Sequence, residues 1–150
     1  MKIIKKSPKD VDAIMLMDEL SKSLENITGA SGKNSFDPND VLVPRSLFVI
    51  AYDDSGQAIG CGAFRPITEY TAEVKRMFAK VKDIGIGTII LKHLETEARN
   101  IGYNSLLLET RVINKAAVNF YRKNNYIQIE NYGKYANNPE AICFQKNLYK

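Results

Sequence analysis

The sequence has little of the side-chain chemistry on which metal enzymes and thiol enzymes depend. It contains no tryptophan, one histidine (His93), and two cysteines, Cys61 and Cys143, that lie far apart inside apolar runs. No cluster of cysteine and histidine has the spacing of metal ligands, so we predict no metal site. Both thiols are predicted to be reduced and buried, because disulfides are rare in the cytosol. No pattern in the sequence supports the alternatives, a disulfide or a catalytic thiol.

Long apolar runs and dense positive charge are also missing. No stretch approaches the roughly 20 apolar residues needed to cross a bilayer. The basic residues 1–6 have no apolar segment behind them, so we predict no signal peptide and expect a cytoplasmic protein. The net charge of +4 is small and scattered, whereas nucleic-acid binding needs a basic patch or a recognisable motif. We therefore expect neither a nucleic-acid partner nor a membrane partner.

The length and the apolar pattern predict one α/β domain spanning residues 1–150. Strands are predicted over residues 2–6, 47–52, 58–65, 71–79, 105–110, 126–129 and 141–146, and helices over 8–27, 86–100 and 114–123. The strand, helix and buried strand between residues 71 and 110 imply parallel pairing inside a mixed sheet. The polar stretch 28–44 is predicted to be a loop that contacts a substrate.

Two predictions concern the faces of the central strands. Period-two alternation in residues 71–79 predicts one face with Glu73, Lys75 and Met77 and another with Val74, Arg76 and Phe78. Gly60 and Gly62 would weaken their strand unless it bulges or another element approaches it closely.

A glycine-containing loop joins the strand 71–79 to the following helix. Gly85-Ile86-Gly87 lies where unpaired backbone N–H groups and the positive end of the helix dipole favour an anion. Glycines let a phosphate approach that backbone closely, and Lys82 adds positive charge. Taken alone, the loop is also compatible with a tight turn whose glycines only aid packing. The dinucleotide-binding fingerprint is incomplete, because Ile90 occupies the third glycine position.

The loop and its surroundings resemble the GNAT superfamily of N-acetyltransferases. Residues 82–87, Lys-Asp-Ile-Gly-Ile-Gly, resemble that family's Arg/Gln-x-x-Gly-x-Gly/Ala loop, and residues 72–79 are similar to its central strand. Leu108-Glu109-Thr110, Asn114, Ala117, Phe120-Tyr121 and Asn125-Tyr126 resemble its second motif, so the likeness runs from about residue 48 to 148. The departures are Lys82, which lacks the planar fork of arginine, Asp83 in place of a small residue, and Asn125 in place of glycine. Asn125 is tolerable because asparagine visits the left-handed region more easily than most residues.

The resemblance implies a fold and a reaction. The fold is a mixed, mostly antiparallel sheet of about six to seven strands with parallel central pairing, flanked by three to four helices. The reaction is direct transfer of acetyl from acetyl-CoA to a primary amine within a ternary complex, and exposed strand edges make a homodimer an expected option. The residues expected to bind the cosubstrate are Met77, Phe78, Ala79, Lys82, Asp83, Ile84, Gly85, Ile86, Gly87, Thr88, Asn114, Ala117 and Tyr121.

The resemblance also suggests catalytic roles. Tyr121 is predicted to be the general acid, since a phenol can protonate a departing thiolate at neutral pH; its alternative role is packing against the sheet. Glu73 is predicted to be the general base, and its alternative is an ion pair across the sheet. A backbone N–H near Phe78 or Ala79 is expected to meet the oxyanion. Asn114 either bonds the cosubstrate or caps its helix.

Three cations on the central strands, Arg65, Lys75 and Arg76, are candidates to bind an acceptor carboxylate or phosphate, unless they are only solvated. The segments Cys-Gly-Ala-x-Arg-Pro at 61–66 and Tyr-Gly-x-Tyr at 132–135 are shared with relatives whose acceptors are mostly unassigned. Two rival functions remain open at this point. One is a catalytically weak acyl-CoA-binding sensor or scaffold of the same fold, and the other is a small nucleotide-binding α/β protein.

Overall fold

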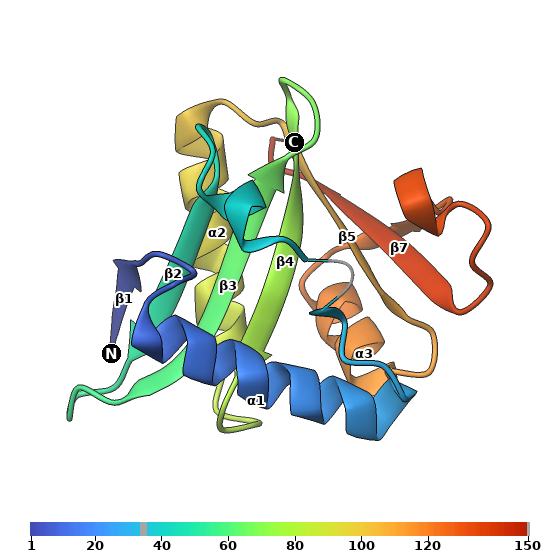
Figure 1. Ribbon diagram of the computed structural model, residues 1–150. Coiled ribbons are helices and arrows are strands. Elements are labelled where there is room, and N and C mark those ends of the chain that lie inside the picture. The colour runs from blue at the N-terminus through green and yellow to red at the C-terminus, as the bar shows by residue number, and fades with distance from the viewer. Residues whose placement is uncertain (34–35, 150) are drawn as a thin grey trace.

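The computed structural model describes residues 1–33 and 36–149. Within them, seven strands form one sheet in the order β1-β2-β3-β4-β5-β7-β6 (Figure 1). The strands are β1 Lys2–Lys5, β2 Leu47–Tyr52, β3 Ala58–Pro66, β4 Thr71–Ala79, β5 Ser105–Arg111, β6 Ile127–Ile129 and β7 Ala141–Asn147. The helices are α1 Val11–Thr28, α2 Ile86–Ile101 and α3 Lys115–Lys123, with short 3₁₀ turns η2 Pro38–Val41 and η3 Gly133–Tyr135. The predicted α/β architecture is confirmed, because β4 and β5 are parallel and the other neighbouring strands are antiparallel.

Helix ends differ from the predicted ones by a few residues for local reasons. Helix α1 begins at Val11 rather than at residue 8, because the Asp10 side chain accepts a hydrogen bond from the N–H of Asp12 and caps the helix. Asn114 likewise precedes α3 as its cap instead of being its first residue. The predicted loop 28–44 contains η2, and its residues 34–35 lie outside the described part of the chain.

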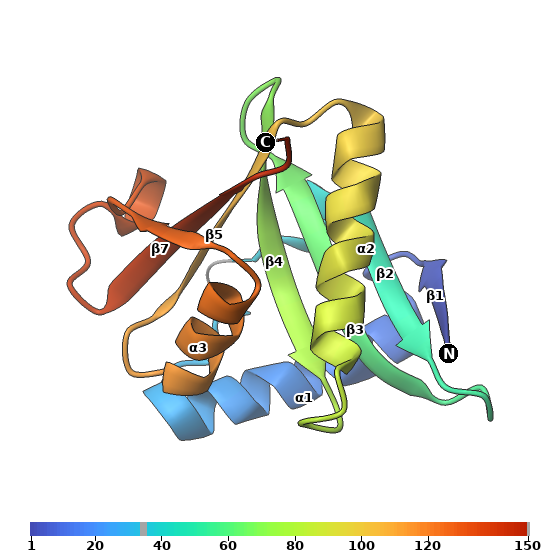
Figure 2. The same ribbon diagram turned by 180° about the vertical axis from the view of Figure 1, so that it is seen from behind.

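The helices cover the two faces of the sheet. Helix α1 crosses one face (Figure 1), and α2 and α3 lie on the other (Figure 2). A Cβ on Gly60 would lie 2.8 Å from Cδ1 of Ile90 in α2, and one on Gly62 would lie 2.8 Å from Cγ2 of the same residue. These two glycines therefore let α2 pack directly onto β3, which is the close approach that the sequence required.

Strands β4 and β5 pair only at their beginnings and then diverge. Their parallel register joins Thr71, Ala72 and Glu73 to residues 105–107, and no pairing follows in the rest of the described strands. Strand β5 turns instead to β7, with which it pairs along its whole length. The sheet is therefore open between β4 and β5, as both views show (Figures 1 and 2).

A bulge in β4 changes which side chains share a face. Cys61 faces Phe78 and Ala63 faces Lys75, so three steps along β4 match two along β3, and Arg76 takes a φ of 53°. The Arg76 guanidinium reaches Ser21 and the Met17 carbonyl oxygen of α1.

The predicted alternation is therefore wrong beyond Lys75. Arg76 and Phe78 join Glu73 and Lys75 on the α1 face, while Met77 turns to the α2 face. Without the bulge, period-two alternation would have held along the whole strand.

Two further observations concern the two thiols and the hydrophobicity of the helices. Cys61 and Cys143 are free and buried, as predicted. Among the described residues, no helix is long and apolar enough to cross a bilayer.

Candidate active site

The gap between β4 and β5 forms a cleft with a cavity of about 500 Å³. The end of α1, together with Ala30, Gly32 and Phe36, borders it on one face of the sheet, and the start of α2 and helix α3 border it on the other. Twelve residues predicted to bind the cosubstrate line this one cavity: Met77, Phe78, Ala79, Lys82, Asp83, Gly85, Ile86, Gly87, Thr88, Asn114, Ala117 and Tyr121. Ile84 is outside the lining and its side chain is exposed. The roles of all these residues stay predictions.

The glycine loop has the geometry of an anion site. Gly85 caps α2 with a φ of 83°, and a Cβ on it would have no heavy atom within 4 Å, so its surroundings are open. The first N–H groups of α2 have no partner inside the helix and lie at the positive end of its dipole. Lys82 lies beside this opening, with its ammonium over the ring of Phe78. A phosphate would meet backbone donors and positive charge together.

The edge of β4 offers backbone groups to the same cleft. Hydrogen-bonded and non-hydrogen-bonded pairs alternate along an antiparallel ladder. Lys80 donates a 2.8 Å hydrogen bond to the carbonyl oxygen of Ile59, so the next pair, Ala79 with Gly60, is of the other kind. The N–H and C=O of Ala79 therefore point away from β3 and toward the cleft, where an extended ligand could bond them. The same alternation turns the N–H of Phe78 toward β3, so Ala79 is the better placed of the two predicted oxyanion donors.

Tyr121 lies on α3 at the wall of the cleft. Its ring packs edge-on against Phe120 and Tyr126, and its hydroxyl makes no hydrogen bond to any described residue. Burial raises the pKa of the Tyr121 phenol, so the group holds its proton at neutral pH. Asn114 caps α3 by accepting a 3.2 Å hydrogen bond from the N–H of Ala117. The alternative proposed for Asn114 is thus present, and its contact with a cosubstrate stays a prediction.

Glu73 is fully buried and its carboxylate is already occupied. Its Oε1 accepts from Nε of Arg65 at 2.8 Å, and its Oε2 accepts from the Tyr132 hydroxyl at 2.6 Å. The ammonium of Lys75 lies 3.8 Å from Oε1. Glu73 is not part of the cleft lining. The ion-pair alternative is therefore present, and the base role stays a prediction that these contacts do not favour.

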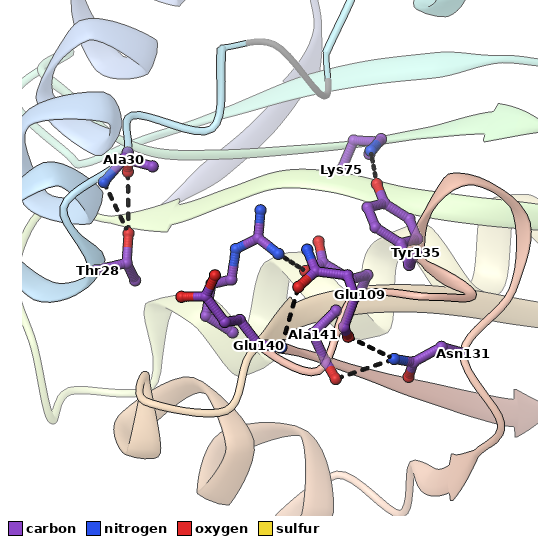
Figure 3. Close-up of polar contacts among 10 residues, drawn as sticks. Thr28, Ala30, Lys75, Glu109, Asn131, Tyr135, Glu140 and Ala141 are labelled. Carbon is purple, nitrogen blue, oxygen red and sulfur yellow. Dashed lines mark hydrogen bonds and ion pairs between the residues drawn. The ribbon is translucent and has the colours of Figure 1, made fainter.

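The segments 61–66 and 132–135 meet around this carboxylate. Arg65 comes from the first segment and Tyr132 from the second, and each bonds one oxygen of Glu73. Tyr135 then accepts a 2.9 Å hydrogen bond from Lys75 (Figure 3). The η3 turn is thereby fixed against β4, and the Lys75 ammonium is held at the cleft.

Glu109 and Arg111 are functional candidates that the motif comparison missed. In β5, Leu106 and Leu108 enter the core beneath α2 and α3, so Glu109 and Arg111 project to the α1 face of the cleft. Oε2 of Glu109 and Nη1 of Arg111 are 3.4 Å apart, both are buried, and neither makes a hydrogen bond within the described chain. Burial raises the pKa of the Glu109 carboxyl, and the charge of Arg111 opposes that shift. The signal available in the sequence was the charge at every second residue after an apolar strand.

The sequence model of the acetyltransferase (GNAT) family matches residues 14–126. The chain belongs to the GNAT acetyltransferase family. It is an acyltransferase, and the matched region contains β4, the glycine loop and Tyr121.

Individual relatives agree with this assignment. The chain is 33% identical over 149 residues to an "IAA acetyltransferase" of Azospirillum brasilense, with 97% of each chain covered. Its structure is similar to a protein from Klebsiella pneumoniae described as an acyl-CoA N-acyltransferase, with a TM-score of 0.83, 25% identity, and 99% and 97% of the two chains covered. It also shares its fold with a GNAT acetyltransferase of Elizabethkingia anophelis that has acetyl-CoA bound, with a TM-score of 0.71, 19% identity and 97% of each chain covered.

Proposed function

We propose that this GNAT enzyme transfers the acetyl group of acetyl-CoA directly to a primary amine while both substrates are bound. One observation carries the proposal: a single cleft is lined by the open glycine loop at the start of α2, by Tyr121 and by the carboxylate of Glu109. The acetyl-CoA in the Elizabethkingia structure of the same fold supports the choice of cosubstrate.

The residues present fit the cosubstrate. The amides of residues 85–88 and Lys82 would hold its pyrophosphate, because Gly85 leaves open space at the helix end. The free edge of β4 at Ala79 would pair with its extended arm. Ala117 and Phe120 supply an apolar wall on the α3 side of the cleft.

Two side chains provide the proton transfers. The amine nitrogen bonds to the acetyl carbon, the carbonyl oxygen takes up the negative charge, and the carbon–sulfur bond then breaks as the carbonyl re-forms. Glu109 accepts the proton that the amine loses, and Tyr121 donates its proton to the departing sulfur. We assign the base to Glu109 because it lines the cleft with an oxygen that has no hydrogen bond, whereas both oxygens of Glu73 are bonded.

The test is a binding measurement followed by an activity screen. Titration calorimetry with acetyl-CoA, CoA, ATP and NAD should show selective binding of the two CoA compounds. Release of free thiol should then follow when amines are added. No binding of acetyl-CoA at millimolar concentration would refute the proposal. Binding without turnover of any amine would instead support the sensor or scaffold function.

A further inference from the structure

The cleft runs through the sheet and offers a different chemistry on each face. The glycine loop, Ala117 and Tyr121 belong to the α2 and α3 side. Lys75, Glu109 and Arg111 project to the α1 side, where Leu24 and Ile27 of α1 also line the cavity. If the proposed function holds and the cosubstrate occupies the first side, the acceptor must approach from the second.

Glu109 and Arg111 are poorly satisfied in this part of the cleft. Arginine has five N–H donors, yet Arg111 donates no hydrogen bond to any described residue. Oε2 of Glu109, 3.4 Å from Nη1 of Arg111, is likewise buried without a hydrogen bond. The two groups form an ion pair with each other, but at 3.4 Å this pair supplies neither with a hydrogen bond. A buried donor and a buried acceptor that lack hydrogen bonds cost free energy, which a ligand bearing both complementary groups would recover. The complement of a carboxylate beside a guanidinium is an ammonium beside a carboxylate.

Lys75 adds a second cation to the part of the cleft that contains Glu109 and Arg111. Its ammonium has three donors, and one of them bonds Tyr135. Its nearest carboxylate, that of Glu73, lies at 3.8 Å and is already bonded by Arg65 and Tyr132. Lys75 therefore retains donors for a ligand.

The other two candidate cations are committed elsewhere. Arg65 lies outside the cavity lining and bonds Glu73, and Arg76 bonds Ser21 and Met17 of α1. Among the three cations singled out in the sequence, Lys75 is thus the one that remains free to bind an acceptor anion.

The wall opposite these charges is apolar. It is formed by Leu20, Leu24, Ile27 and Phe36, which line the cavity from α1 and the loop that follows it. Figure 3 looks into this region, with Lys75, Tyr135 and Glu109 on one side and Thr28 and Ala30, just after the α1 wall, on the other. A ligand here meets paired charges on the strands and hydrocarbon on the helix.

We propose that the acceptor is a free amino acid with an apolar side chain. Its carboxylate binds Arg111 and Lys75, its amino group binds Glu109, and its side chain packs against Leu24 and Ile27. This inference rests on the proposed function and names its acceptor. A simple amine would leave the buried Nη1 of Arg111 without a hydrogen bond, and a polyamine would bring a further cation beside Arg111 and Lys75.

The experiment compares L-leucine with L-leucinamide and 3-methylbutylamine, which keep the side chain and lose the carboxylate, and with spermidine. Thiol release from acetyl-CoA is recorded at pH 7.5. We expect a kcat/KM for leucine about 100-fold above that of the other three, because each of these leaves the cations of the cleft without the carboxylate that would pair with them. The amine of leucinamide is less basic than that of leucine, so a larger fraction of it is neutral and reactive at pH 7.5. Amine basicity would therefore favour leucinamide and cannot produce a preference for leucine over it. Equal or faster acetylation of leucinamide, 3-methylbutylamine or spermidine would overturn the inference and leave the proposed function intact.

Variants locate the preference within the cleft. Arg111→Gln should lower the ratio of kcat/KM for leucine to kcat/KM for leucinamide about 100-fold, because any effect of the variant on Glu109 is common to both amines and cancels in the ratio. Lys75→Met should act in the same direction, and Arg99→Gln on α2, outside the cleft lining, serves as the control. Calorimetric binding of leucine to the CoA-saturated protein gives a readout without turnover. Absence of leucine binding in a protein that binds CoA refutes the amino-acid acceptor alone, whereas absence of CoA binding refutes both proposals.

Discussion

The Tyr132 hydroxyl lies 2.6 Å from Oε2 of Glu73, although the two residues are 59 positions apart in the chain. This bond, with Arg65 on the other oxygen, ties the turn before β7 to the middle of β4. A carboxylate held in this way orders the sheet face on which the acceptor is proposed to bind. Four predictions distinguish residues that stabilise the fold from residues that take part in catalysis or in acetyl-CoA binding.

Glu73→Gln should cost stability and leave the pH dependence of catalysis unchanged. The change removes the charge that partners Arg65, and breaking a buried pair costs about 3 kcal/mol, the lower end of the usual range, because Arg65 is 31% exposed. The melting temperature should fall by roughly 10 °C for a chain of this length. Differential scanning calorimetry gives the stability, with the exposed Glu69→Gln as control. Loss of an acidic limb from the pH–rate profile would restore Glu73 as the base.

Glu109→Gln should act in opposite directions on activity and stability. The rate of the native enzyme should rise with pH through the raised pKa of Glu109, and this limb should disappear in the variant. Burial disfavours the ionised carboxylate and therefore raises its pKa. At a pH above this raised pKa the carboxylate is ionised and destabilises the fold. At a pH below the ordinary pKa of glutamate the carboxyl is protonated in the folded and the unfolded chain, so the effect is absent. The variant should therefore melt above the native protein at pH 8 and show little difference at pH 4. A variant with a native pH–rate profile would exclude Glu109 as the base.

Tyr121→Phe should lower kcat about 100-fold while acetyl-CoA binding and melting temperature stay close to native, since its hydroxyl bonds no described residue. Tyr126→Phe is the matched control on the neighbouring ring. It removes a buried 2.9 Å hydrogen bond to Glu95, which should cost about 1–3 kcal/mol of stability without a comparable loss of kcat. If both variants keep native kcat, Tyr121 is a packing residue only.

Lys82→Ala should weaken acetyl-CoA binding about 3- to 10-fold at low salt, and the difference from native should shrink at high salt because the lysine is solvent-exposed. Lys92→Ala, on α2 outside the cleft, should bind normally. Calorimetric titrations at two salt concentrations measure both effects. An unchanged Kd in Lys82→Ala would mean that the backbone amides alone hold the phosphates.

Much of this architecture could be predicted from the sequence. The strands and helices follow from apolar periodicity, and the parallel pair follows from a strand, helix and strand in succession. Asn125, where the family has glycine, takes a φ of 70°, as an asparagine can. The helix cap at Asn114 was also among the open alternatives, because asparagine is a common cap.

The remainder depended on long-range contacts that local patterns do not contain. Strand β4 itself has no glycine or proline to signal its bulge, and the glycines that suggested one, Gly60 and Gly62, lie on the partner strand β3. The bulged Arg76 bonds distant groups on α1. Glu73 looked like a base because its strand position matched, yet its partners Arg65 and Tyr132 are known only from the fold. Glu109 is the middle residue of Leu108-Glu109-Thr110, a position at which the family motif specifies no residue type. Only the divergence of β4 from β5 places it in a cleft.

Because of the bulge at Arg76, β4 has one residue more than its ladder with β3 needs. A descendant that lost Arg76 would keep Lys75, Met77 and Phe78 on their present faces, because removal of the bulge restores regular alternation. It would lose the contacts of the guanidinium with Ser21 and Met17 of α1. A residue lost from the regular part of the strand would instead turn every following side chain to the other face and separate the two halves of the cleft. The tolerance of β4 to a single-residue deletion in evolution therefore depends on where the deletion falls.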